Sequence, residues 1–144
     1  MLKWILSKIP HITIPVDGSA YLTRYYLLGR DWPWFGIFLH FFHKSDVGPL
    51  HTHPWTWGWS FILKGGYQQV RCLAGKNRVP RWDTYYPGDT NTITKDVYHK
   101  VHLNDEVNGC WTLFVVGKRN RDWTFLDPDT GEIMPRSINP GSVA

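Results

Sequence analysis

Hydrophobic and aromatic residues occur along this chain in short runs, which glycine, proline and other turn-forming residues separate. Such runs are too short for typical helices, and their boundaries are typical of β-strands. We therefore expect strands over the ranges Tyr21–Leu28, Phe35–His43, Trp57–Leu63, Tyr67–Cys72, Val79–Tyr85, Thr90–Thr94, Val97–Leu103, Cys110–Val116 and Arg121–Leu126. Many short strands at close spacing predict an all-β sandwich or barrel. Helical periodicity is limited to residues 1–9, which have room for one short helix.

Two glycine-containing sequences predict hairpins between these strands. Gly65-Gly66 separates the runs at 57–63 and 67–72, which we expect to pair with each other. Asn108-Gly109 is a strong hairpin signal and leads into the run at 110–116. The run at 35–42 is apolar at both odd and even positions, so we expect a strand that is covered on both sides, for example by a second subunit.

The length of 144 residues fits one domain, with its core at about residues 21–126 and an extended C-terminal tail at 127–144. A hydrophobic content of 42% excludes a chain that is disordered throughout. No apolar run approaches the ~20 residues of a membrane helix, and the apolar start is too short for a signal peptide, so we expect a cytoplasmic location without membrane contact. Cys72 and Cys110 form no C-x-x-C motif, and we expect buried thiols.

The formal net charge is +4. This mild excess permits an anionic small molecule as ligand, but it does not indicate nucleic acid as a partner, because no nucleic-acid-binding motif accompanies it. Lys118, Arg119 and Arg121 follow the run at 110–116. They are interpreted either as a clamp for a carboxylate or phosphate, or as a solvated basic rim.

The most informative segment is His51-Thr52-His53. Two histidines at positions i and i+2 of an extended chain point to the same side. Their imidazoles can then converge on one ion at about 2.0–2.1 Å, and neutral imidazole suits iron, zinc, nickel and copper. The same pattern is also found where two partly buried histidines end a strand, so it needs support from its surroundings.

That support is a resemblance to the cupin superfamily, which covers about residues 35 to 117. Gly48, His51, His53 and Gly65 match its first motif, and Pro87-Gly88 with His99 match its second. The segments 39–67 and 111–117 look more specifically like small single-domain cupins of bacteria and their viruses, which would make the location a host cytoplasm. The resemblance implies a double-stranded β-helix (jelly-roll barrel), a metal site of His51, His53 and His99, and a homodimer.

The sequence departs from the family pattern at two places. The family glutamate should lie at position 58, where this chain has Gly58, so the usual fourth protein ligand is missing. The stretch between Pro87-Gly88 and the third histidine is long, and His102 therefore competes with His99 for that role. A site of three neutral histidines leaves the charge and open positions of a divalent ion available, and it resembles the cysteine dioxygenase type. Fe(II) is the expected ion, with Zn, Ni or Mn as alternatives.

Other residues are candidates for contacts with a substrate. His40 is read either as a group of the same cavity or as a core histidine bonded to a carbonyl, and Ser60 and Arg119 could orient substrate. Trp55, Trp57 and Trp59 alternate and could share one face, unless Pro54 breaks the register. Filling of the core is favoured for these tryptophans over a stacking wall for a sugar or base.

Three functions remain open. The first is a metal-dependent, dioxygenase-like enzyme that acts on a small polar or anionic molecule. The second is a non-catalytic cupin that binds a small ligand or serves as an accessory subunit. The third is a metal-independent sugar epimerase or isomerase. Fold alone does not choose among them, because cupins host many unrelated activities.

Overall fold

The structure is a computed structural model, and it describes residues 1–74, 79–127 and 129–134. Its elements are α1 (Leu2–Ser7), β1 (His11–Val16), β2 (Ser19–Leu28), β3 (Gly36–Phe42), β4 (Trp57–Lys64), β5 (Tyr67–Cys72), β6 (Arg81–Tyr85), β7 (Thr90–Thr94), β8 (Tyr98–Leu103), β9 (Cys110–Val116), β10 (Phe125–Leu126) and β11 (Ile133–Met134). The short N-terminal helix and the all-β class are confirmed. None of the described helices is long and apolar enough to cross a membrane.

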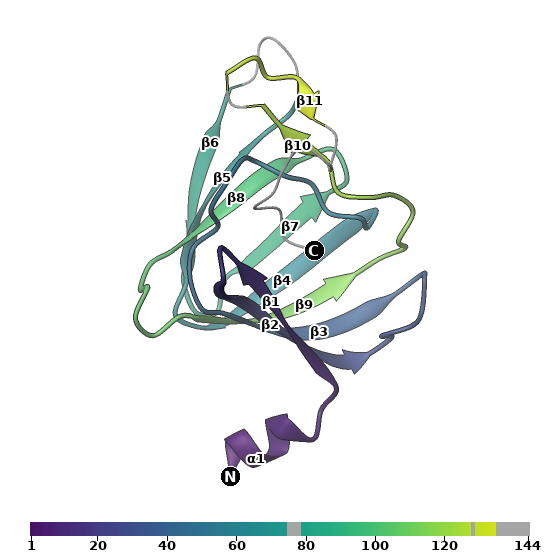
Figure 1. The fold of residues 1–144 in the computed structure, drawn as a ribbon, viewed down its shortest axis with the longest axis vertical. Helices are drawn as coiled ribbons and strands as arrows, with labels where there is room; N and C mark the ends of the chain where they lie inside the picture. Colours follow the sequence, from purple (N-terminus) through teal and green to yellow (C-terminus); the bar gives the residue numbers. More distant parts are fainter. Residues whose placement is uncertain (75–78, 128, 135–144) are drawn as a thin grey trace.

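The strands form two main sheets that close around one interior (Figure 1). The larger sheet has the order β1-β2-β3-β9-β4-β7, the smaller has the order β6-β5-β8, and β10 pairs with β11. Side chains from both main sheets pack together, since Ile62 and Cys110 of the larger sheet contact a cluster with Tyr67 and Val101 of the smaller one. Burial of this shared apolar surface is what holds the sheets face to face.

The prediction of a hairpin at Gly65-Gly66 is wrong. β4 pairs with β7 and β9, whereas β5 pairs with β6 and β8, so the two strands lie in different sheets. Gly65 has φ of 86°, and a β-carbon there would lie 2.4 Å from the carbonyl oxygen of Gly109. The diglycine is therefore a corner, where the chain passes from one sheet to the other under a close main-chain contact.

The prediction of a hairpin at Asn108-Gly109 is also wrong, because β8 and β9 belong to different sheets. The turn itself exists. Gly109 has φ of 70°, its N–H donates to the carbonyl oxygen of Asp105, and the Asp105 carboxylate accepts from the N–H groups of Val107 and Asn108. This wider turn redirects the chain instead of pairing the strands beside it.

The hydrophobic pattern missed the two-residue hairpin between β1 and β2. β1 and β2 are joined by Asp17-Gly18, with φ of 51° and 74°, as a two-residue hairpin turn requires. Pro15 lies at a bulge in β1, which interrupts the register. The strand expected over 121–126 is reduced to β10, and residues 133–134 return to pair with it. The remainder of the expected tail, from residue 135, lies outside the described residues.

Candidate metal centre

A cavity inside the barrel brings together residues from both main sheets. Its walls carry apolar side chains such as Leu22, Ile93 and Phe114, together with an unusual number of polar ones. The polar lining residues are Arg24, His40, Asp46, His51, His53, Ser60, Tyr67, Gln69, His99 and Thr112. A mostly apolar pocket with a few convergent polar groups is the usual form of a small-molecule site.

Main-chain hydrogen bonds fix the positions of the three histidines. His51 and His53 lie on the segment between β3 and β4, and His99 lies on β8. The N–H of His51 donates to the carbonyl oxygen of His99 at 3.1 Å, and the N–H of His99 donates back at 2.9 Å. On its other side, the same segment is bonded to the chain near β10, where the N–H of Thr52 donates to the carbonyl oxygen of Thr124. The segment is thus held between β8 and the end of the barrel.

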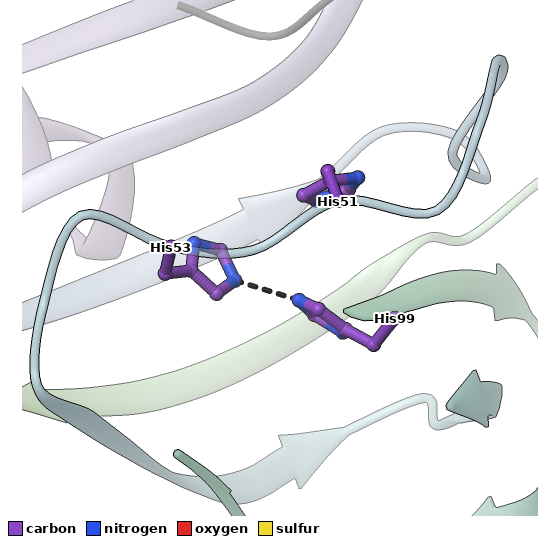
Figure 2. A group of neighbouring side chains, drawn as sticks. All are labelled: His51, His53 and His99. Atoms are coloured by element: carbon purple, nitrogen blue, oxygen red, sulfur yellow. Dashed lines mark hydrogen bonds between the residues drawn. The ribbon is translucent and has the colours of Figure 1, made fainter. Parts of the chain in front are cut away.

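The three imidazoles converge, as Figure 2 shows. Their candidate ligand atoms all lie within 4.8 Å of one another, and Nε2 of His53 lies 2.7 Å from Nε2 of His99. One of these two nitrogens carries the proton that the other accepts. The Nδ1 atoms of His53 and His99 are buried without a hydrogen-bond partner among the described residues. Three converging imidazoles, two of which have an unsatisfied buried nitrogen, fit a divalent cation.

Burial favours the neutral form of the His53 and His99 imidazoles, which is the form that binds metal. Burial lowers the pKa of His53 well below its usual value, and the charges of His51 and Arg24 lower it further. Burial likewise lowers the pKa of His99, with further contributions from His53 and His51. His51 and His99 are both buried, with exposed fractions of 8% and 4%.

The structure brings His99, and not His102, beside His51 and His53. His99 faces the barrel interior together with Val101 and Leu103, because side chains at every second position of β8 share a face. His102 lies on the opposite face, where its ring packs at 5.6 Å from that of Trp82. His99 is therefore the histidine that joins His51 and His53.

Position 58 has no room for a side chain. Gly58 faces the barrel interior, and a β-carbon built there would lie 2.7 Å from Cζ of Phe114 and 2.9 Å from Cε2. The Phe114 ring also lies 5.9 Å from the ring of His53. An aromatic ring thus fills the space that the family glutamate would need, so the site has three imidazoles without this carboxylate.

The three candidate substrate contacts occupy different positions. His40 is 4% exposed and lines the cavity, where its Nε2 accepts a hydrogen bond from Nε of Arg24 at 2.9 Å. Burial lowers the pKa of His40 well below its usual value, and the charge of Arg24 lowers it further. Ser60 also lines the cavity, with its hydroxyl 3.2 Å from that of Tyr67. Arg119 packs instead over the Trp123 ring, at 5.7 Å from its centroid.

Two charged cavity residues escaped the sequence analysis. Asp46 is 5% exposed, and its Oδ2 accepts a hydrogen bond from the N–H of Val101. Burial raises the pKa of this carboxyl. Arg24 lies on β2, on the same strand face as Leu22 and Tyr26. A charged residue on an apolar face is unusual, so this pattern could have identified Arg24 as a candidate functional residue.

A polar network joins Asn91 to two residues that line the cavity, Tyr67 and Gln69. The Asn91 amide donates to the Tyr67 hydroxyl at 3.0 Å and to Oε1 of Gln69 at 2.6 Å. Burial raises the pKa of Tyr67 to about 12, so this hydroxyl stays protonated. Nε2 of Gln69 and Oδ1 of Asn91 are buried and find no partner in the described part of the chain. Water or a ligand can satisfy such groups.

The expectation that the three tryptophans fill the core holds for one of them. Trp55 is 7% exposed and packs in a cluster with Phe38 and Phe114. Trp57 and Trp59 lie on the outer face of β4, opposite to the inward-facing Gly58 and Ser60, and Trp57 is 41% exposed. The register changes between Trp55 and Trp57 because Trp55 precedes β4, next to Pro54.

Comparison with solved structures shows the fold. The structure of Fe(II)-HppE with an alternative substrate has a TM-score of 0.61 at 13% identity, over 77% of this chain and 57% of that one. Oxalate decarboxylase from Bacillus subtilis has a TM-score of 0.55 at 13% identity, over 79% and 28%. Oxalate oxidase has a TM-score of 0.53 at 15% identity, over 72% and 54%. This chain thus spans a little over half the length of HppE.

These similarities identify the barrel as a cupin fold, as the sequence resemblance implied. No protein-family model and no curated protein sequence matches the chain. At such low identity the shared property is the fold, so chemistry must be argued from the site itself.

Proposed function

We propose that this chain is a mononuclear metal-dependent cupin enzyme of the dioxygenase type, in which His51, His53 and His99 hold the ion. The observation that carries the proposal is the convergence of these three imidazoles inside the cavity, with their ligand atoms within 4.8 Å of one another. A closed structural site would use four protein ligands, whereas a set of three leaves positions open for substrate.

Fe(II) is the proposed ion, and Zn, Ni and Mn are the alternatives. A bound divalent ion would polarise a coordinated oxygen and orient substrate. The chain would supply the remaining functions through its own residues. Ser60 and Tyr67 present hydroxyl groups to the same cavity, and the Phe114 ring packs beside His53 and limits the room for water there.

The proposed substrate is a small polar or anionic molecule. The cavity is enclosed by both sheets, which favours a small molecule over a polymer. The names of the structural neighbours support the same class, since they specify hydroxypropylphosphonic acid and oxalate as the molecules on which those proteins act. Both are small acids.

A homodimer is part of the proposal. The outer face of β3 carries Ile37, Leu39 and Phe41, which are only half-buried within the chain. A second copy could cover this apolar face, in accord with the apolar pattern of the strand. Sedimentation at micromolar concentration tests this point, and a monomeric profile would remove it.

Metal content is the decisive measurement for the proposed function. Elemental analysis of untagged protein, purified without chelator, should find about one equivalent of metal per chain. The double variant His51→Ala/His53→Ala should lose it, and His102→Ala should keep it, because His102 lies outside the cavity. Iron as the bound metal would direct further work to oxygen-consumption screens.

The opposite result is equally clear. If the wild-type protein binds no metal after reconstitution with iron, zinc, nickel and manganese, the metalloenzyme proposal fails, and a ligand-binding cupin remains. Turnover that is indifferent to chelator would instead support the epimerase or isomerase.

A further inference from the structure

Arg24 is a cation without an acidic partner in the cavity wall. Its side chain extends from β2 into the cavity that holds the histidine cluster. Within the described residues, the ion pairs closer than 4.0 Å are Arg71–Asp83 and Arg81–Asp83, and neither involves Arg24. Arg24 is half-buried, and a charge that has lost part of its hydration is normally paired. No ion pair among the described residues therefore balances the charge of Arg24.

The surroundings hold the Arg24 guanidinium in place without neutralising it. Its Cζ lies 5.2 Å from the Phe38 ring and 5.3 Å from the Trp55 ring. Its Nε donates to Nε2 of His40, the residue directly opposite in the β2–β3 register. These contacts, together with a side-chain hydrogen bond to Tyr26, orient the guanidinium, and His40 accepts as a neutral ring.

The charges near Arg24 are also unbalanced. Burial lowers the pKa of Arg24 from its usual value, a side-chain hydrogen bond with Tyr26 raises it in part, and the neighbouring charge of Arg119 lowers it. Nearby, Arg121 donates from Nε to the carbonyl oxygen of His53, while its Nη2 is buried without a partner among the described residues. Asp46 is the acidic residue that lines the cavity, and it uses Oδ2 to bind the main chain of Val101. An incoming anion would therefore meet a positive environment.

We propose that Arg24 binds an oxyanion of the substrate, a carboxylate or a phosphoryl group, and that His40 is the residue that positions Arg24 for this contact. The inference rests on the proposed function, since it assigns the substrate class of the same cavity. The planar guanidinium offers paired N–H donors that match two oxygens of such a group. The anion would supply the charge that the protein does not provide.

The shape of the cavity extends the argument to the rest of the substrate. Gln69 and Tyr67 line the cavity, and the buried Nε2 of Gln69 finds no partner among the described residues. They can receive a neutral polar group, such as a hydroxyl or an amide, through ordinary hydrogen bonds. A molecule with one acidic end and one polar end fits these walls better than an uncharged sugar.

The test measures anion binding by metal-stripped protein with isothermal titration calorimetry. Malonate and inorganic phosphate serve as probes, and they distinguish carboxylate from phosphoryl recognition. Malonamide, which is uncharged, is the control ligand. Arg24→Gln should weaken binding of the preferred anion roughly 10- to 100-fold, because a charge-assisted pair of hydrogen bonds is lost. Arg81→Gln makes the same change of charge at an exposed position and should leave binding unchanged.

His40 is tested as a positioning residue in the same assay. His40→Leu removes the acceptor for Nε of Arg24 and should weaken anion binding, whereas His40→Gln retains an acceptor and should recover most of it. If Arg24→Gln does not fold, as judged by circular dichroism, Arg24→Lys keeps the charge without the planar fork. It should still bind the anion more weakly than the wild type.

Three results would overturn the inference. The first is undiminished anion binding by Arg24→Gln or, if that variant does not fold, by Arg24→Lys. The second is equal binding of malonamide and malonate by the wild type. The third is the absence of any anion binding by the wild type. The metal content of Arg24→Gln is measured separately and should equal that of the wild type. Failure of the anion site and failure of the metal site therefore give different results.

Discussion

Gly58 and Phe114 share one space in the barrel, since a β-carbon on Gly58 would lie 2.7 Å from Cζ of Phe114. The two residues lie on the adjacent strands β4 and β9. This relationship explains how the site differs from the family pattern. Position 58 is glycine, the Phe114 ring occupies the space that a side chain there would need, and the ring in turn packs against His40 and His53.

We expect Gly58→Ala to destabilise the protein by about 1–3 kcal/mol, because the added methyl group forces the Phe114 ring to move in a packed interior. Adding Phe114→Leu to Gly58→Ala should recover part of the lost stability, since the smaller side chain leaves room for the added methyl group. Urea unfolding of the wild type, both single variants and the double variant measures this coupling. Strictly additive effects would contradict the shared space.

Metal should stabilise the folded chain through the histidine cluster. At a free ion concentration 100 times the dissociation constant, the free energy of unfolding should rise by about 2.7 kcal/mol. Thermal melts with and without Zn²⁺ or Mn²⁺ measure the effect. The shift should vanish in His99→Ala and persist in His102→Ala, because His102 lies on the opposite face of β8 from His99. An equal shift in both variants would place the ion elsewhere.

Stability should depend on pH through Asp83. Hydrogen bonds from Arg71 hold the pKa of Asp83 below its ordinary value of 3.8. The pair therefore stabilises the folded state at pH values above 3.8, and this stabilisation is lost as the pH falls through the lower folded-state pKa. Asp83→Asn should cost less than about 1 kcal/mol at pH 7, as expected for a pair near the surface.

Urea unfolding of Asp83→Asn and the wild type at several pH values measures this difference. It should shrink as the pH is lowered below 3.8. Asp96→Asn makes the same change of charge at an exposed position and is the matched control. A difference that stays constant down to the lowest pH would rule out the Arg71–Asp83 pair as its source.

Both thiols should resist modification in the folded protein. Cys110 is fully buried, and burial raises its pKa to about 11, so very little thiolate is present at pH 8. Cys72 is buried as well. Labelling with iodoacetamide should be on the order of 100-fold slower in the native state than in urea, where both cysteines should react. Rapid native labelling of either residue would show that its strand opens readily.

Local sequence patterns predicted the strands well, because a strand's boundaries depend on nearby turn residues. The bounds of β5, β7 and β9 match the expected ranges. Which strands pair was predicted poorly. Gly65-Gly66 has the composition of a hairpin turn, yet it crosses between sheets, because pairing is decided by partners far along the chain such as β9 for β4.

The site was predicted only in part for the same reason. His51 and His53 lie close together in sequence, so their spacing alone indicated a shared side. Arg24 has meaning only once β3 lies beside β2 and places His40 opposite it. Asp46 stands in a sequence typical of a turn, and nothing local reveals that its carboxylate enters the cavity.

The main-chain pairing of His51 with His99 also sets when the site can exist during synthesis of the chain. A nascent chain that ends before β8 contains His51 and His53 but lacks the strand that aligns them. We predict that a chain truncated after Asp96 binds the ion no better than a two-histidine peptide, and tighter binding would contradict this. The closed barrel would then determine which metal ion is bound. The first ion to contact His51 and His53 in the nascent chain would not determine it.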